Sequence, residues 1–201
     1  MLVFRQVSDQ EELNAVFRLR YEVYCLEKKY LDSNNYNGYE RDKYDDYAVN
    51  FLALETDDNH HLLGCFRLIP NNPYGFPCEL HYNLNFKADK RDRTAELSRM
   101  IVAPCARSMW RHVLMGLSKE VYIYNTENNI LYNYAAMDYL LIVALQRMKL
   151  PFKIIGESGS YMGETIPSVL DMVELEKTLP QSNAWLYEYL KSPREDQQDW
   201  F

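Results

Sequence analysis

Four charged groups stand among apolar stretches of this 201-residue chain, at positions that suggest a shared site. They are Arg20, the acidic segment at residues 40–45, Arg67 within the mostly apolar stretch 64–70, and the segment Glu96-Leu97-Ser98-Arg99. A charge inside a strand is costly to bury unless an opposite charge meets it. The sequence therefore predicts a polar site at one end of a sheet, where strand charges pair with the acidic segment.

Glu96 is the side chain best suited to acid–base chemistry. A strand carboxylate can take a proton from an attacking amine, directly or through a water molecule. Spacing alone favours the alternative, a structural carboxylate paired with Arg67 or Arg20. In a regular strand Glu96 shares a face with Ser98, and Arg99 points to the opposite face.

The arginines and the acidic segment each have two interpretations. Arg20, Arg67 and Arg99 can bind a substrate carboxylate in bidentate fashion, or they fix the acidic loop on the sheet. Asp42 and Asp45 can hold the ammonium group of an amine substrate, or they lie on a solvated loop.

Two further groups are candidates for binding. Tyr24 and Tyr30 can line an apolar slot, although core aromatics are the commoner case. A basic cluster follows the Glu96 strand and suggests an anionic partner such as a carrier protein or a phosphate, with a solvated helix face as the alternative. Its members are Arg107, Arg111, His112 and Lys119.

Composition argues against several classes of function. The formal net charge of -7 disfavours nucleic acid as a general partner, because phosphate binding needs a basic face. No apolar run reaches the ~18 residues that span a bilayer, so we expect no membrane span. The four cysteines are widely spaced, which predicts free thiols and a reducing, cytoplasmic location. We expect no metal site, because histidines are few, and no serine or cysteine nucleophile, because the usual motifs are missing.

The hydrophobic pattern predicts one α/β domain over residues 1–201. Its central sheet is mixed and mostly antiparallel, with helices on both faces, and the strand–helix–strand alternation of the second half predicts a parallel crossover. We expect strands at residues 2–7, 49–55, 62–70, 95–103, 130–136, 152–155 and 169–175, and helices at 10–27, 109–127, 137–148 and 183–190.

Three segments are expected to be irregular. Residues 28–47 form a long polar loop, and loops of this length in compact domains are usually functional or disordered. Residues 71–93 are expected to be loop with a short helix. The C-terminal tail, residues 192–201, is expected to fray.

Four segments in order resemble the acyl-homoserine-lactone (autoinducer) synthases and the related N-acyl amino acid synthases, which share the acetyltransferase-like (GNAT) fold. The segments are Arg20-x-x-x-Tyr24 with Tyr30, Glu40-x-Asp42-x-Tyr44-Asp45, Gly64-Cys65-Phe66-Arg67-Leu68-Ile69-Pro70, and Glu96-Leu97-Ser98-Arg99. Beyond residue 105, Ala136-Met137-Asp138 and Met162-Gly163-Glu164-x-x-Pro167 are more similar to acyltransferases associated with exosortase systems. Tyr24 and Tyr30 replace a Phe and a Trp of the synthases, which argues against S-adenosylmethionine as the acceptor.

The resemblance implies a GNAT-like sheet and a site with named roles. Glu96 and Arg99 are the catalytic candidates, and backbone N–H groups of Ile101, Val102 and Ala103 are expected to stabilise an oxyanion. Arg107, Arg111 and Lys119 are expected to meet a carrier protein. The expected substrate-binding residues are Arg20, Tyr24, Tyr30, Glu40, Asp42, Asp45, Arg67 and Ser98.

The resemblance also implies the substrates. We expect no permanently bound cofactor, an acyl carrier protein (ACP) or acyl-CoA thioester as donor, and a small amine as acceptor. The stretch at residues 102–107 lacks the glycines with which ordinary acetyltransferases bind coenzyme A phosphates, which favours ACP. The resulting hypothesis is an N-acyltransferase that acylates an amine such as an amino acid with a long chain. The alternatives are an autoinducer synthase that uses S-adenosylmethionine and a non-catalytic acyl-binding or sensor domain.

Overall fold

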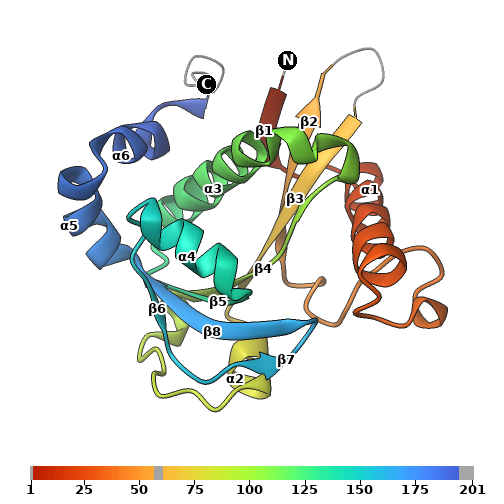
Figure 1. The fold of residues 1–201 in the computed structure, drawn as a ribbon, viewed down its shortest axis with the longest axis horizontal. Helices are drawn as coiled ribbons and strands as arrows, with labels where there is room; N and C mark the ends of the chain where they lie inside the picture. The colour runs from red at the N-terminus through yellow and green to blue at the C-terminus, as the bar shows by residue number, and fades with distance from the viewer. Residues whose placement is uncertain (1, 57–60, 195–201) are drawn as a thin grey trace. The chain divides into compact units, whose positions relative to one another are not determined.

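The computed structural model describes residues 2–56 and 61–194, which form a sheet flanked by helices (Figure 1). The strands are β1 (Leu2–Gln6), β2 (Val49–Glu55), β3 (His61–Pro70), β4 (Thr94–Val102), β5 (Tyr132–Met137), β6 (Phe152–Ile154), β7 (Gly159–Ser160) and β8 (Glu164–Asp171). The α-helices are α1 (Gln10–Tyr21), α2 (Pro77–His81), α3 (Trp110–Glu127), α4 (Tyr139–Arg147), α5 (Met172–Ser182) and α6 (Ala184–Lys191).

The strand order is β1-β2-β3-β4-β5-β8-β6, and β7 pairs with β8 outside this path. Strand β1 is antiparallel to β2, and β8 is antiparallel to β5, β6 and β7. Strands β4 and β5 are parallel and are joined by α3. The predicted mixed sheet with a parallel crossover is therefore confirmed. Strand β6 does not pair with β5, because β8 lies between the two strands and is antiparallel to both.

The chain divides into two compact units, each assembled from segments far apart in the sequence. Unit 1 contains Met1–Arg67, Arg99–Tyr122 and Ser192–Phe201, and unit 2 contains Leu68–Ser98 and Ile123–Lys191. The candidate arginines and the acidic segment all fall in unit 1, whereas Glu96 falls in unit 2. A single domain over the whole chain stays a prediction.

Local signals explain how α1 begins and where it changes. The side chain of Asp9 accepts a hydrogen bond from the Glu12 N–H at 2.9 Å, which caps the helix. Glu12 also accepts the Ser8 N–H and pairs with Arg5 on β1, so the helix is tied to the sheet of unit 1. The predicted helix over residues 10–27 is helical throughout, but its last part, Glu22–Glu27, is a π-helix.

Unit 2 is organised around an apolar cluster on one face of β5. Its buried members are Phe76, Cys78, Ala88, Tyr134, Ile155 and Val169. The Tyr134 ring meets Phe76 edge to face at 5.5 Å, and its hydroxyl accepts the Ala88 N–H at 2.7 Å. This cluster joins the loop around α2 to the sheet of the unit.

The prediction of a last strand over residues 169–175 was wrong in its C-terminal half, because α5 begins at Met172. The Asp171 side chain accepts the N–H groups of Val173 and Glu174, which is the cap that ends β8 and starts the helix. Asp171 is therefore the residue that caps the start of α5, which the apolar pattern of residues 169–175 did not indicate. The predicted hairpin turn at residues 57–59 lies outside the described residues.

The C-terminal prediction also needs correction. Lys119 and Glu120 on α3 are both buried, and the residues after α6 supply their partners. The Lys119 ammonium donates to the Ser192 hydroxyl at 2.7 Å and to the Pro193 carbonyl at 2.9 Å, and Arg194 pairs with Glu120 at 3.1 Å. Residues 192–194 are therefore fixed rather than frayed, because buried charges need them. The remaining tail lies outside the described residues.

Across residues 2–56 and 61–194, none of the helices combines the length and the apolar character needed to cross a membrane.

Truncation after Lys191 should lower the free energy of unfolding by about 3 kcal/mol, because it removes partners of two buried charges. Urea unfolding followed by circular dichroism measures this change. Lys119→Met in the truncated chain should recover part of the loss, since no ammonium then stays buried, and Lys191→Ala, at an exposed position, is the control. A truncated chain as stable as the full chain would show that these contacts contribute nothing.

Candidate active site

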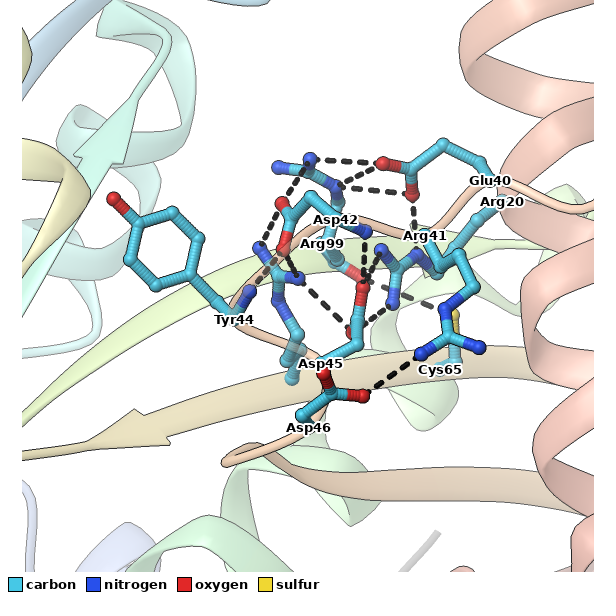
Figure 2. Close-up of polar contacts among 10 residues, drawn as sticks. Arg20, Glu40, Arg41, Asp42, Tyr44, Asp45, Asp46, Cys65 and Arg99 are labelled. Atoms are coloured by element: carbon cyan, nitrogen blue, oxygen red, sulfur yellow. Dashed lines mark hydrogen bonds and ion pairs between the residues drawn. The ribbon is translucent and has the colours of Figure 1, made fainter. Parts of the chain in front are cut away.

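Six charged side chains of unit 1 form a closed ring in which arginines and carboxylates alternate (Figure 2). Each carboxylate contacts two arginines, and each arginine contacts two carboxylates. We call this set the charge ring; in order around it, its members are Arg20, Glu40, Arg99, Asp42, Arg67 and Asp45.

Arg20 contacts two carboxylates of the charge ring. Its Nη1 and Nη2 donate to Oδ1 and Oδ2 of Asp45 at 2.7 and 2.9 Å, and its Nε donates to Glu40. Arg67 donates to both oxygens of Asp42 at 2.8 and 3.1 Å and lies 3.0 Å from Asp45. The bidentate geometry uses the planar guanidinium, which a lysine could not replace.

Arg99 closes the charge ring. Its Nη2 donates to Glu40 at 2.9 Å and to Asp42 at 3.0 Å. Arg20 comes from α1, Arg67 from β3 and Arg99 from β4, while the three carboxylates come from the loop at residues 28–47. The charge ring therefore ties the loop to one helix and two strands of unit 1.

The charge ring is buried almost everywhere except at one side. The side chains of Arg20, Glu40 and Arg67 are fully buried, whereas that of Asp42 is 23% exposed. Buried charges are tolerated only when opposite charges and hydrogen bonds satisfy them, and here each has two opposite partners. Asp42, with Arg99 beside it, is thus the side of the charge ring that solvent reaches.

Backbone contacts shape the acidic segment into a turn. The Glu40 N–H donates to the Phe17 carbonyl on α1 at 3.0 Å. The Asp42 N–H donates to the Asp45 carboxylate at 2.8 Å, and the Tyr44 N–H donates to Asp42 at 2.9 Å. Aspartates that bond nearby backbone N–H groups are typical of such turns. The loop predicted from composition is thus folded where it carries the carboxylates.

The charge ring shifts the proton affinities of its members. Burial alone would raise the pKa of Glu40, but the charges of Arg99 and Arg20 outweigh it and lower that pKa to about 2. Asp45 behaves in the same way, since Arg67 and Arg20 overcome its burial and hold its pKa below the ordinary value. Burial lowers the pKa of Arg20, but Asp45 and Glu40 more than compensate, so it lies above the ordinary value. All three groups are therefore ionised at neutral pH.

Arg99 has a left-handed backbone conformation, with φ of 54°, inside β4. This conformation costs a non-glycine residue roughly 1–2 kcal/mol and persists only where its surroundings determine it. The expectation that Glu96 and Arg99 point to opposite faces assumed a regular strand, so it does not apply at this position.

Tyr24 and Tyr30 lie together beside the charge ring. Their rings stack with centroids 6.3 Å apart, and the Arg99 guanidinium lies 5.5 Å from the Tyr24 centroid. Burial raises the pKa of Tyr24 to about 12, so its hydroxyl stays protonated. Their predicted role in binding stays a prediction, but the structure places them at the charge ring.

Glu96 lies in unit 2 and is buried. Its Oε2 accepts the Cys78 N–H at 2.8 Å, a contact that sequence reasoning did not anticipate. Cys78 lies 18 positions earlier in the short helix α2, and no periodicity of the sequence relates it to β4. Ser98 is partly buried, and its predicted role in binding stays a prediction.

The structure limits the predicted oxyanion donors. The Ala103 N–H already donates to the Leu63 carbonyl at 2.8 Å, so this residue was wrongly included. The pairing of β4 with β5 covers residues 94–97, and Ile101 and Val102 lie beyond it. Ile101 and Val102 stay predicted donors.

The predicted basic cluster does not form one patch. Lys119 is buried, as described above, so its inclusion was wrong. Arg107 pairs with Glu27 at 2.5 Å, and the Arg111 guanidinium lies 5.5 Å from the Trp110 ring. Arg107 and Arg111 are exposed and stay candidates for contact with a carrier protein.

Comparison with known proteins shows what this chain is similar to. Residues 19–117 match the acetyltransferase (GNAT) domain, a span that contains the charge ring and Glu96. A comparison with curated protein sequences finds no match. The fold is GNAT-like, and over about half of its length the chain is similar to this domain, whose members transfer acyl groups.

Solved structures with this fold include synthases. BjaI, a CoA-dependent acyl-homoserine lactone synthase with SAM and isopentyl-CoA, has a TM-score of 0.72 and 19% identity over 96% of this chain and 91% of its own. FeeM, an N-acyl amino acid synthase from uncultured soil microbes, has a TM-score of 0.63 and 15% identity over 90% and 98%. The acyl-homoserine-lactone synthase LasI has a TM-score of 0.64 and 18% identity over 86% and 89%. The GNAT-like fold that the four segments implied is confirmed.

Glu40→Gln should flatten the pH dependence of stability in acid. The pKa of Glu40 is about 2 in the folded chain and 4.5 ordinarily, so its contribution is complete above about 4.5 and is lost as the pH falls toward 2. Urea unfolding at several pH values gives the slope for the wild type and for Glu40→Gln. Exposed Glu188→Gln is the control, and equal slopes for all three chains would contradict this account.

Proposed function

We propose that this chain is an N-acyltransferase. It moves a long-chain acyl group from an ACP or CoA thioester to the amine of a small acceptor such as an amino acid. The match of residues 19–117 to the acetyltransferase (GNAT) domain carries this proposal, since that span contains every catalytic candidate. The fold that the chain shares with FeeM, described as an N-acyl amino acid synthase, supports the choice of acceptor.

The members of the charge ring differ in burial, and the proposal assigns them different roles on that basis. Arg20, Glu40, Arg67 and Asp45 are too enclosed and too fully paired to bind a substrate, so they brace the loop. Solvent reaches the charge ring at Asp42, whose side chain is 23% exposed, and Arg99 lies next to it with 6% of its side chain exposed. In the proposal Asp42 attracts the acceptor ammonium and Arg99 its carboxylate, while Tyr24 and Tyr30 flank them.

Glu96 is the proposed general base. The amine nitrogen forms a bond to the thioester carbonyl carbon and loses a proton to Glu96, directly or through water. Backbone N–H groups at Ile101 and Val102 stabilise the oxyanion of the tetrahedral intermediate. The carbon–sulfur bond then breaks, the thiolate leaves and takes up a proton, and the amide product remains.

The turn between β4 and α3 favours a carrier protein over free CoA as the donor. Pro104 has no N–H, and the N–H groups of Ala103 and Ala106 donate to Leu63 and Ala103. Few backbone donors therefore remain there for a pyrophosphate, which agrees with the absence of glycine at residues 102–107. BjaI is described as CoA-dependent, so both donors belong in the test.

Product mass spectrometry should reveal an N-acyl product. Purified protein is offered acyl chains of several lengths on ACP and on CoA, with a pool of amino acids, polyamines and S-adenosylmethionine. Glu96→Gln should lower turnover by about 100-fold or more, because general-base catalysis contributes this much. A mutant as fast as the wild type would exclude Glu96 as the base.

Two other outcomes would replace the proposal. An acyl lactone would indicate an autoinducer synthase, a second candidate that the fold shared with BjaI supports. Tight binding of acyl thioesters without transfer to any amine would indicate an acyl-binding or sensor domain.

Asp42→Asn and Asp45→Asn should separate binding from bracing. Asp42→Asn should raise the KM for the amine by about 10-fold, since a charged hydrogen bond to the ammonium is lost. Asp45→Asn should lower the free energy of unfolding by about 3 kcal/mol, because two buried guanidiniums lose a charge partner. Steady-state kinetics and urea unfolding measure both effects in both variants. An unchanged KM in Asp42→Asn would remove its role at the ammonium.

A further inference from the structure

Gly64 lies in β3 at a place where the structure has no room for a side chain. A methyl group at Gly64 would lie 2.5 Å from the Ile101 carbonyl oxygen and 2.6 Å from Cγ1 of Val113 on α3. Atoms in ordinary contact are roughly 3.5 Å or more apart, so a methyl group here would displace its neighbours by about 1 Å. Position 64 therefore requires glycine, because the backbone of β4 approaches it closely.

Cys65, the next residue of β3, contacts β4 through its thiol. Its Sγ donates to the Arg99 carbonyl oxygen at 3.7 Å, and 1% of Cys65 is exposed (Figure 2). Burial raises the pKa of this thiol to about 12, so the thiol is protonated at neutral pH and acts as the donor. A thiol is a weak donor, but the carbonyl that it meets belongs to the residue with the left-handed backbone.

These two contacts reach β4 on opposite faces of the sheet. Successive side chains of a strand point to opposite faces, so the Cβ direction of Gly64 and the thiol of Cys65 face opposite ways. In a regular antiparallel ladder, carbonyl groups point along the sheet toward the next strand. The carbonyls of Arg99 and Ile101 instead lie where β3 directs its side chains, so both leave the regular ladder.

Residues 99–102 of β4 carry groups that the proposed function needs, the Arg99 guanidinium and two backbone N–H groups. They lie beyond the residues of β4 that pair with β5, which leaves β3 as the neighbouring strand that contacts them. The Ala103 N–H donates to the Leu63 carbonyl at 2.8 Å, so the residue that follows this segment is also tied to β3. The position of the segment therefore depends on β3.

We propose that Gly64 and Cys65 are positioning residues that hold residues 99–102 in the geometry needed for acyl transfer. The proposal rests on the proposed function, in which groups of this segment act on the substrates. Gly64 sets the distance between β3 and β4 because it has no side chain, and Cys65 fixes the Arg99 carbonyl through its hydrogen bond. Preorganised groups lose much of their catalytic effect when they are misplaced by about 1 Å.

Gly64→Ala tests the distance between the two strands. A crystal structure of the variant should show residues 99–102 displaced by about 1 Å, because the methyl group meets a backbone atom that cannot rotate away. The variant should also have kcat lowered by about 10-fold or more, since the oxyanion donors are misplaced. Gly116→Ala on α3 is the matched control. A methyl group there would crowd the Phe4 ring and not β4, so kcat should stay unchanged.

Cys65→Ala tests the hydrogen bond to the Arg99 carbonyl. KM for the amine should rise by about 3-fold with little change in kcat, because Arg99 is the proposed partner of the acceptor carboxylate and a thiol is a weak donor. Cys65→Ser should restore KM, since its hydroxyl also donates. Circular dichroism melting checks that each variant folds. If KM is the same in all three chains, Cys65 does not position Arg99 and its part of the proposal is overturned.

The crystal structures, which need no turnover, separate this proposal from the proposed function. If residues 99–102 keep their place in Gly64→Ala while Val113 and α3 move, Gly64 does not position the segment, whatever the activity. If the segment is displaced and kcat stays as in the wild type, the positioning stands and the proposed role of the β4 N–H groups fails. Equal losses of kcat in Gly64→Ala and Gly116→Ala would show a general effect of crowding and would also overturn the proposal.

Discussion

The charge ring is the constraint on which unit 1 depends. Each member contacts two members of opposite charge. Removing one member therefore takes a partner from two largely buried charges, which costs far more stability than the loss of a surface ion pair. The chain therefore needs an arginine from α1, one from β3 and one from β4 together with three carboxylates of one loop. This requirement fixes the loop without regular secondary structure, and it sustains the left-handed backbone of Arg99 within a strand.

The carboxylates of the charge ring have equal numbers of arginine partners but differ in their exposure to solvent. Glu40 and Asp45 each lie between two arginines that are buried or nearly so, and both are themselves enclosed. Asp42 has the same number of partners but is partly exposed. The charge ring thus holds the loop rigidly through its buried members and leaves one charged side that solvent reaches. In this way a loop can be both ordered and available for binding.

The types and order of the charged residues predicted that the arginines would pair with the acidic segment. Contacts that form only when distant parts of the chain fold together could not be predicted. Strand arginines among apolar residues required carboxylates, and the acidic segment was the evident source. Which arginine met which carboxylate could not be deduced, because β3 and β4 are far from the loop in sequence. Lys119 was wrongly placed on a surface because its partners, residues 192–194, follow it by more than 70 positions. The contact of the Cys78 N–H with Glu96 also gave no signal in the sequence, since it depends on the fold and not on residue spacing.

Glu40 and Glu96, two of the buried glutamates, show why environment, not residue type, decides which carboxylate can be a base. Glu40 lies between two guanidiniums, and its low pKa means that it releases a proton far more readily than it accepts one. Glu96 accepts a hydrogen bond from a neutral donor, the backbone N–H of Cys78, at 2.8 Å, and a neutral donor stabilises a carboxylate less than a fixed positive charge does. Proton transfer requires that a carboxylate can adopt both its protonated and its ionised form. Carboxylates in unlike environments can therefore take different roles, one structural and one chemical. The low pKa of Glu40 therefore suits a structural role, whereas the proposed base, Glu96, lies outside the charge ring.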